Sequence, residues 1–444
     1  MRDRFRREWG GNAMRRTLIA LAMAVPLLFG LPAQALPQSG PVGPAPAVLA
    51  PVDASVGTPP SDVAATLDPL LADRSLGRSV GAVVMDVAAG VVVYDIEATK
   101  PRALASNQKV FTALAILDAL GPEARITTSV LWDEATATLT LVGAGDPTLA
   151  SVSATGSSLA VLADAVAARV SGAVSLTYDT SLFSGPTIAP GWSSDYAAMG
   201  VAAPVSPLIV DRARVLGGDA RESDPALAAA TAFAAVLADR GVIVGDIRMG
   251  SATGRVIATT ESVPVATMVE TMLTESDNDS SEILAHLAGA IQSGTGSFAS
   301  GAAATLTTLQ SAGIPVQGAG FVDGSGLSYE DIASPLTLVS AISLTASASA
   351  PAWTWPVGLG LPVAGLTGTL ADRFVGPDTR SAAGFVRAKT GTLIGVATLA
   401  GTVVDRDSRL LAFAFMSDGT SDTDAARAAL DRAATALAAC GCRG

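Results

Sequence analysis

The chain contains only three lysines, Lys100, Lys109 and Lys389, and two of them lie in patterns that can do chemistry. In Ser106-Asn107-Gln108-Lys109, a serine stands three residues before a lysine. Residues with this spacing share one face of a helix, so the Ser106 hydroxyl and the Lys109 amine can meet. A serine hydroxyl needs a base, and a lysine can serve if burial or a second cation lowers its pKa. A helix cap followed by a surface lysine would look the same, so this pattern alone does not decide between the two.

A second polar pattern, Ser276-Asp277-Asn278, follows an apolar helical stretch. Ser276 could relay a proton between Lys109 and a leaving group. Asn278 could accept a hydrogen bond from Lys109 and donate one to a substrate amide, and Asp277 is expected to contact the substrate. The alternative is a polar cap at a helix boundary.

The third pattern is Lys389-Thr390-Gly391-Thr392 at the start of a long apolar run. Gly391 would let another backbone approach closely, and we expect that backbone to be a substrate peptide docked as an added strand. Lys389 supplies positive charge, and the hydroxyls of Thr390 and Thr392 can hold a carboxylate. The N–H groups of Thr392 and Ser106 could form an oxyanion hole. The alternative is an edge-strand lysine in a turn.

The order of the three patterns, S-x-x-K, S-D-N and K-T-G, is the signature of class A β-lactamases and penicillin-binding proteins. We therefore predict two sets of site residues. The catalytic set is Ser106, Lys109, Ser276, Asn278 and Lys389, and the substrate-binding set is Asp277, Thr390, Gly391 and Thr392. A Ser-His-Asp triad would have to use His286, the one histidine, which we expect to pack within the helix that follows Asn278.

Apolar periodicity and turn residues predict the elements that position these residues. Strands dominate both ends of the chain, and helices dominate between them. The pattern predicts hairpins over 79–96 and 127–142, helices from about 106 to Gly121-Pro122 and over 158–170, 225–240 and 264–290, long strands over 388–404 and 409–416, and a last helix through Ala439 with Asp422 as its N-cap. This order predicts an α/β fold, an α+β sandwich, in which 63–124 and 264–444 form one catalytic domain and 125–263 form an inserted domain.

Composition excludes several classes of protein. The 444 residues are 49% hydrophobic and 15% charged, which is too apolar for a disordered chain. The formal net charge of -12 repels phosphate backbones, so we expect no nucleic-acid partner. One histidine and two tail cysteines, Cys440 and Cys442, leave almost no ligands for zinc or haem, and we expect no metal and no cofactor. We expect the two cysteines to be exposed thiols in a frayed tail.

The first 62 residues look like an export signal followed by a tether. Arg15 and Arg16 precede an apolar run from Leu18 to Leu31, and Ala33-Gln34-Ala35 resembles a cleavage site. Residues 1–35 are therefore predicted to be a signal peptide, with an uncleaved membrane anchor as the alternative. Residues 36–62 hold seven prolines between Pro37 and Pro60 and are predicted to be a linker. An exported, extracytoplasmic protein is expected, tethered to a membrane if the signal is not cleaved.

Together with these motifs, further stretches resemble the class C low-molecular-mass penicillin-binding proteins, the D-alanyl-D-alanine carboxypeptidase/endopeptidase family. The stretches that carry the resemblance are Gly145 to Leu149, Tyr178-Asp179 with Phe183, Gly191-Trp192, Asp323 to Ser328, Leu361 to Gly365, Gly368 to Leu370, and Arg387 to Leu393. The resemblance implies a serine β-lactamase/transpeptidase-like domain, with the insertion between the first two motifs. It further implies acylation of Ser106, with peptidoglycan stem peptides as substrates and β-lactams as covalent inhibitors.

The chain departs from the family at two places. Only 170 residues separate Ser106 from Ser276, so we expect one inserted domain where larger members have two. Pro207 also follows Ser206, where the family usually has a small or polar residue.

Two other functions share the same motifs. A β-lactamase would need a base for fast deacylation and is ordinarily shorter, without a large insertion. A non-catalytic wall-binding or β-lactam-sensing protein could share the fold, but it is expected to have lost one of the motif residues.

Overall fold

The computed structural model describes residues 63–153 and 155–440. The predicted signal peptide, linker and Cys442 lie outside the described residues. No helix within those ranges is long and apolar enough to cross a membrane.

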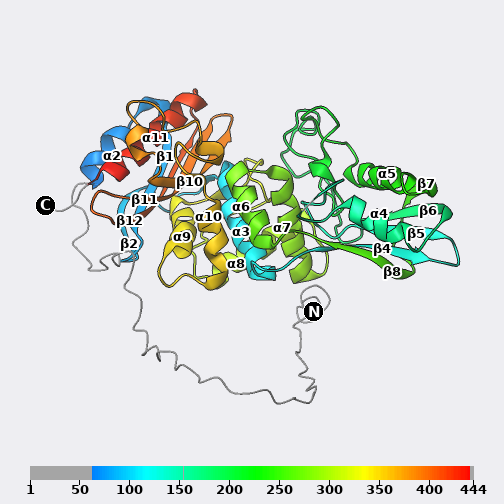
Figure 1. Ribbon diagram of the computed structural model, residues 1–444. Helices are drawn as coiled ribbons and strands as arrows, with labels where there is room; N and C mark the ends of the chain where they lie inside the picture. Colours follow the sequence, from blue (N-terminus) through cyan, green and yellow to red (C-terminus); the bar gives the residue numbers. More distant parts are fainter. Residues whose placement is uncertain (1–62, 154, 441–444) are drawn as a thin grey trace, which may run out of the picture.

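An antiparallel five-stranded sheet, in the order β10-β11-β12-β1-β2, forms one end of the molecule (Figure 1). Its strands come from both ends of the described chain, as the sequence predicted. They are β1 (Ser79–Asp86), β2 (Val91–Ile96), β10 (Val386–Leu393), β11 (Val396–Val404) and β12 (Leu410–Asp418). Strand β1 lies beside β12, with Ser79 opposite Asp418 and Asp86 opposite Leu411, so the two chain ends are joined in one sheet.

The central strand β12 is buried on both faces. Its side chains point alternately to opposite sides of the sheet, and helices pack on each side. Phe413 and Phe415 pack with helices α2 (Val63–Leu71) and α11 (Thr423–Ala439). Ala412, Ala414 and Met416 belong to the core on the other side. The Asp422 carboxylate accepts a hydrogen bond from Ala425 N (2.9 Å) and caps α11, which confirms the predicted start of the last helix.

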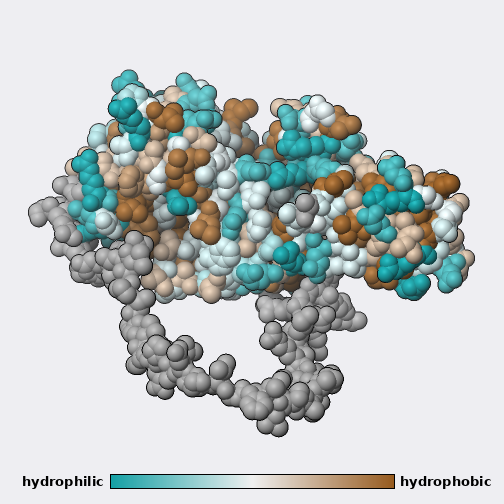
Figure 2. Space-filling model, viewed as in Figure 1, coloured by the Kyte–Doolittle hydropathy of each residue, from teal (hydrophilic) through white to brown (hydrophobic). Residues whose placement is uncertain are grey.

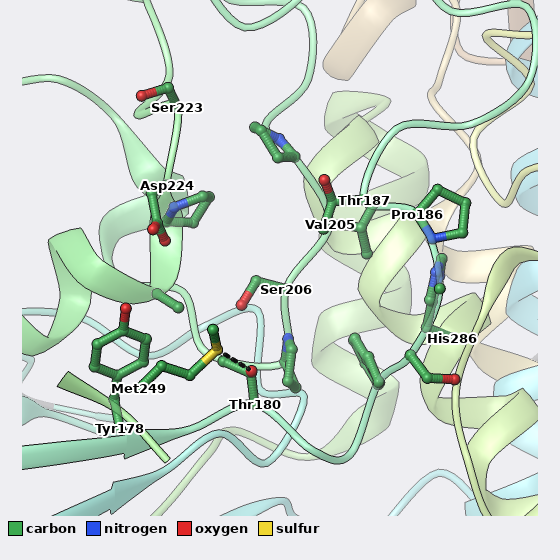
Figure 3. Close-up of a pocket in the computed structure, with 17 residues that line it drawn as sticks. Tyr178, Thr180, Pro186, Thr187, Val205, Ser206, Ser223, Asp224, Met249 and His286 are labelled. Carbon is green, nitrogen blue, oxygen red and sulfur yellow. Dashed lines mark hydrogen bonds between the residues drawn. The ribbon is translucent and has the colours of Figure 1, made fainter.

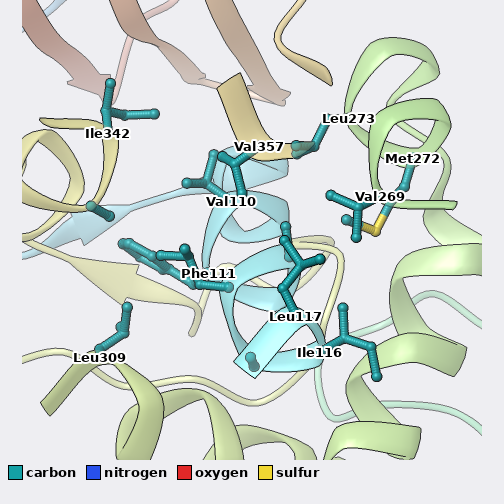
Figure 4. Packing of buried hydrophobic residues seen from close by; sticks show 14 of the residues in the cluster. Val110, Phe111, Ile116, Leu117, Val269, Met272, Leu273, Leu309, Ile342 and Val357 are labelled. Carbon is teal, nitrogen blue, oxygen red and sulfur yellow. The ribbon is translucent and has the colours of Figure 1, made fainter. Parts of the chain in front are cut away.

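A layer of helices packs on that other side of the sheet. It consists of α3 (Gln108–Leu120), α6 (Val265–Glu275), α7 (Asn278–Ser293), α8 (Phe298–Ser311), α9 (Pro335–Ala346) and α10 (Trp355–Gly360). Helix α3 is central and is buried from Gln108 to Leu117. Figure 4 shows Val110, Phe111 and Leu117 pointing from α3 toward side chains of its neighbours. The helix that begins beside Ser106 is therefore held from several sides, which fixes the position of its first turn.

A second, mixed five-stranded sheet, in the order β7-β6-β5-β4-β8, lies at the opposite end of the molecule (Figure 1). Its elements are β4 (Thr127–Asp133), β5 (Thr138–Val142), β6 (Gly172–Asp179), β7 (Val242–Met249) and β8 (Arg255–Glu261), with helices α4 (Leu159–Ala167) and α5 (Pro225–Ala238) packed against them. The segment enters through β4 and leaves through β8, and these two strands pair with Thr127 opposite Glu261. A segment whose first and last strands are paired neighbours can be inserted into another domain, because its two ends lie close together. Below, "the insertion" means residues 125–263.

Short elements complete the fold. They are β3 (Arg102–Ala103) paired with β9 (Ile332–Ala333), and 3-10 helices at Arg74–Leu76, Ala105–Asn107, Asp211–Ala213, Ala352–Thr354, Gly368–Leu370 and Arg380–Ala382. Figure 2 shows hydrophobic and hydrophilic residues intermixed over the face in view.

Three predictions from the sequence were wrong in detail. The run 388–404 is not one strand, because the chain reverses at Ile394-Gly395 between β10 and β11, where Gly395 has φ 76°. The helical stretch 264–290 is broken at Ser276, which has φ 60°. Cys440 is buried rather than exposed, and its sulfur lies 3.8 Å from Thr66 Oγ1 on α2. The turn at Gly395 was missed because it lies within an apolar run that resembles a single strand. Cys440 is buried because helix α2 packs beside it.

Candidate active site

Ser106 lies in the 3-10 turn that leads into α3, and Lys109 is one turn further along. Lys109 is fully buried, whereas Ser106 is partly exposed. Lys109 Nζ donates to Ser106 Oγ across 3.1 Å. Helical spacing has thus brought a partly exposed hydroxyl against a buried amine.

The Lys109 amine makes two further hydrogen bonds, to Asn278 Oδ1 (2.7 Å) and to the Ser325 carbonyl (2.7 Å). An ammonium has three protons, so these three acceptors use all of them. Burial lowers the pKa of Lys109 to about 8, and the negative charges of Asp323 and Glu282 oppose this shift. A lysine with this pKa is neutral in about one molecule in ten at pH 7, so it can act as a base.

The S-D-N residues form the junction between α6 and α7. Ser276 ends α6 in a left-handed conformation, Asp277 precedes α7, and Asn278 is its first residue. The Asn278 side chain accepts from Lys109 and donates through Nδ2 to the Val201 carbonyl (2.8 Å), so it joins the buried lysine to the insertion. The Asp277 carboxylate accepts from Ser280 Oγ and lies 3.4 Å from Arg212 Nε. Within the described residues the Ser276 hydroxyl makes no hydrogen bond, and its side chain is partly exposed.

Lys389 lies in β10, and its side chain is fully buried. Its amine donates to the Thr390 carbonyl (3.1 Å). Burial first, and then the positive charge of Lys109, hold the pKa of Lys389 well below its usual value. Lys389 is therefore a buried amine whose charged form is disfavoured by its surroundings.

The threonines of the third motif differ in their surroundings. Thr390 is buried and its hydroxyl donates to Thr369 Oγ1 (2.9 Å), whereas Thr392 is exposed at the end of β10. Gly391 is also needed for packing within the protein. A Cβ there would meet Thr398 Oγ1 and the Leu104 carbonyl, so the protein's own backbone already comes close at this position.

The loop Asp323–Ser328 lies behind Lys109 and wraps around one carboxylate. Asp323 accepts from the backbone N–H groups of Ser325, Gly326 and Ser328 at 2.6 to 2.9 Å, and from Trp192 Nε1 at 2.8 Å. This loop supplies the Ser325 carbonyl that binds Lys109. Sequence reasoning noted the stretch without assigning it a role. The acidic residue followed by glycines in Asp323–Ser328 was the signal that could have indicated a functional loop. Its role could not be predicted, because the residues that the loop contacts are distant in sequence.

Two further buried acids hold the same loop. Glu282 on α7 accepts from Gly324 N (2.9 Å), and Asp331 accepts from Val322 N (2.7 Å). Burial raises the pKa of Glu282 to about 8 and that of Asp331 well above its usual value, and the charge of Asp323 adds to both shifts. Protonated carboxyl groups can be buried at lower cost than carboxylates.

His286 packs within α7 as predicted. Its ring lies 4.5 Å from Phe298 and 5.1 Å from Phe183, and its Nδ1 meets the Glu282 carbonyl at 2.9 Å. Burial lowers the pKa of His286 to about 4, so the imidazole is neutral near pH 7. A cavity of about 350 Å³ lies where the insertion meets α7, with Tyr178 and Met249 on one side and His286 on the other (Figure 3). None of the nine predicted site residues lines this cavity.

Across residues 63–153 and 155–440, no three His, Cys, Asp or Glu side chains stand together in a way that could hold an ion.

Several known proteins are similar to this chain over most of its length. A model of the D-Ala-D-Ala carboxypeptidase 3 (S13) family matches residues 63–217 and 217–438. Carboxypeptidase DacB of Mycolicibacterium smegmatis is 35% identical over 448 residues, which covers 97% of this chain and 96% of the relative. A D-alanyl-D-alanine carboxypeptidase of an Actinomadura species is 28% identical over 441 residues, with 80% of each chain covered. Penicillin-binding protein 4 (DacB) of Haemophilus influenzae shares the fold, with a TM-score of 0.71 at 21% identity over 84% of this chain and 98% of that one.

The mixed fold and these matches define a serine peptidase, a hydrolase. The chain belongs to the D-Ala-D-Ala carboxypeptidase 3 (S13) family, and the family predicted from its motifs is confirmed.

Proposed function

We propose that the protein removes the terminal D-alanine from peptidoglycan stem peptides through an ester formed on Ser106. The observation that carries this proposal is the 3.1 Å hydrogen bond between the buried Lys109 amine and the partly exposed Ser106 hydroxyl. A lowered lysine pKa supplies the base that a serine nucleophile requires.

In the first step, Ser106 Oγ bonds to the carbonyl carbon of the penultimate D-alanine. Lys109 takes the serine proton, the peptide C–N bond breaks, and the proton passes by way of Ser276 to the leaving amine. The backbone N–H groups of Ser106 and Thr392 stabilise the oxyanion. Water then hydrolyses the ester, which restores the Ser106 hydroxyl and releases the shortened peptide.

Four of the remaining predicted residues contact the substrate in this proposal. Lys389, Thr390 and Thr392 hold the terminal carboxylate, because an amine and two hydroxyls that can donate hydrogen bonds lie together in β10. Asn278 already binds Lys109 and the Val201 carbonyl, and it contacts the peptide at the edge of the cleft. Asp277 acts by way of its neighbours, since its carboxylate is engaged by Ser280 and Arg212.

The same chemistry extends to two further reactants. When the bond attacked lies in a cross-link, the enzyme acts as an endopeptidase. A β-lactam acylates Ser106 by ring opening, and its leaving nitrogen stays attached, so the ester persists. Residues 63–124 and 264–440 carry the chemistry in this proposal, and 125–263 form the inserted domain. The enzyme works outside the cytoplasmic membrane, where peptidoglycan lies.

The test compares the purified protein with Ser106→Ala and with Ser311→Ala, whose serine is exposed at the end of α8. Each is incubated with a fluorescent penicillin and, separately, with a stem pentapeptide, and D-alanine release is measured. We expect a lasting adduct and D-alanine release from the native protein and Ser311→Ala, and neither from Ser106→Ala.

Two other outcomes would replace the proposal. Rapid penicillin turnover without a lasting adduct would indicate a β-lactamase. A folded native protein with neither adduct nor D-alanine release would indicate a non-catalytic wall-binding protein.

A further inference from the structure

Three consecutive residues of the insertion, none of them glycine, have a left-handed backbone. Asp211, Arg212 and Ala213 have φ of 50°, 56° and 50°. This conformation is costly for residues with a Cβ, and it persists only where the surroundings impose it. Strain of this kind often marks a place where a side chain must point in one direction.

The surroundings of Asp211 and Ala213 hold this turn in place. The Asp211 carboxylate accepts hydrogen bonds from the backbone N–H (3.1 Å) and the hydroxyl of Ser151, and Asp211 N donates to the Leu149 carbonyl (3.0 Å). Ala213 is buried in a small apolar cluster with Ile283 of α7. Arg212 lies between two anchored neighbours, so the direction of its side chain is set by the backbone.

Arg212 reaches both sides of the active-site serine Ser276. Its Nη1 lies 2.9 Å from Glu275 Oε2, and its Nε lies 3.4 Å from Asp277 Oδ2. The Asp277 side chain is 5% exposed and the Glu275 side chain 53% exposed, so one arm of this bridge is buried and the other is open to solvent. A planar guanidinium can span two carboxylates, whereas a lysine ammonium acts from one point.

Ser276 itself has the left-handed conformation, with φ 60° and ψ 40°, at the end of α6. Glycine is the usual residue there because it takes this conformation without strain. A glycine has no hydroxyl, however, and a serine in this position needs support from its neighbours. The residues on either side of Ser276 receive that support from Arg212.

We propose that Arg212 is a positioning residue of the reaction. It fixes the Glu275–Asp277 turn so that Ser276 keeps its left-handed conformation and Asn278 stays against Lys109. Through Arg212, the insertion thereby contributes to acylation, although Arg212 itself does not contact the substrate. This inference rests on the proposed function, since it concerns the rate at which Ser106 is acylated.

The experiment measures acylation by a fluorescent penicillin in rapid-mixing kinetics, which separates the binding constant from the acylation rate constant. Arg212→Met is compared with Arg214→Met. Arg214 lies two residues after Arg212, is exposed and pairs with Asp219. Arg212→Lys and Glu275→Gln are milder variants that keep one arm of the bridge. The amount of adduct at saturation counts active sites, and a melting curve reports folding.

We expect Arg212→Met to lower the acylation rate constant per active site about 10- to 100-fold with little change in binding, because a small displacement of a catalytic group has effects of this size. Arg212→Lys and Glu275→Gln should fall between it and the native protein, and Arg214→Met should match the native protein. If Arg212→Met fails to fold, the two milder variants decide by the same criterion.

The inference is overturned if the rate constant per active site is unchanged. It is equally overturned if only the number of active sites and the melting temperature fall, because that is the mark of a purely structural role. A native protein that forms no adduct would refute the proposed function itself, and the inference with it.

Discussion

Lys109 shows how strongly burial changes the chemistry of a single residue. Lys100 is exposed and pairs with Glu97, whereas Lys109 and Lys389 are fully buried. Burial disfavours the charged form of both lysines, and the charge of Lys109 lowers the pKa of Lys389 further. The pKa of Lys109 therefore falls to about 8 although Asp323 and Glu282 are near.

This pKa predicts the pH dependence of acylation. Lys109 must lose its proton before it can accept one from Ser106, so the rate should rise with pH below the pKa and level off above it. We expect the second-order rate constant with a penicillin to increase up to about tenfold per pH unit between pH 6 and 7.5 and to flatten above about 8. Stopped-flow measurements over this range check the expectation.

Lys100→Met is the matched control, because its amine is exposed and its loss should leave the profile unchanged. A flat profile from pH 6 to 9 would show that Lys109 is not the titrating base.

At the scale of elements, the loop Asp323–Ser328 and the first turn of α3 depend on each other. Gly326 has φ 80°, and a Cβ there would meet the Ala105 carbonyl and the Gln108 side chain. Ala105 also has a positive φ of 46°, directly before Ser106. The loop and the first turn of α3 are therefore packed backbone to backbone at Gly326 and Ala105.

Gly326→Ala should consequently destabilise the protein by about 2–4 kcal/mol, since it adds both an overpacked contact and left-handed strain. Gly90→Ala is the control, because Gly90 has φ 67° but no atom lies within 4 Å of the position that the new methyl group would take. That variant should cost only about 1–2 kcal/mol, from the strain alone. Urea unfolding compares the two, and equal losses would mean that the contact with Ala105 does not matter.

At the scale of the whole molecule, the insertion is held to the catalytic part by buried polar contacts. Arg221 Nε lies 2.8 Å from Asp279 Oδ2, and both side chains are almost fully buried. Asp279 also accepts from Ala203 N (2.7 Å), directly beside the S-D-N motif. Trp192 of the insertion donates to Asp323 in the loop behind Lys109. Contacts of this kind tie the two parts together next to the S-D-N motif and the loop behind Lys109.

Breaking this buried pair on one side should cost more than removing both charges. We expect Arg221→Met to lower the free energy of unfolding by about 3–5 kcal/mol, because it leaves an unpaired buried carboxylate. The double variant Arg221→Met/Asp279→Leu should recover part of that loss. Urea unfolding of both variants provides the measurement, and a double variant less stable than the single one would contradict the argument.

The local features of the site could be read from the sequence. Ser106 and Lys109 are three residues apart on a helix, so their contact follows from helical geometry alone. The three motifs, the strands at both ends of the chain and the capped last helix depend on neighbours in sequence, and they were predicted. The turn at Gly395 was missed because one glycine in a long apolar run resembles a strand glycine.

Only the tertiary structure decided which distant groups complete the site. Several groups contact the motif residues, or the loop behind them, from segments 42 to 216 positions away in sequence. They are the carbonyls of Ser325 and Val201 and the side chains of Trp192, Glu282 and Arg212. Periodicity and propensity report how a segment folds against its immediate neighbours. The pKa of a buried lysine and the conformation of Ser276 depend instead on what packs against them, and packing is settled by the whole chain at once.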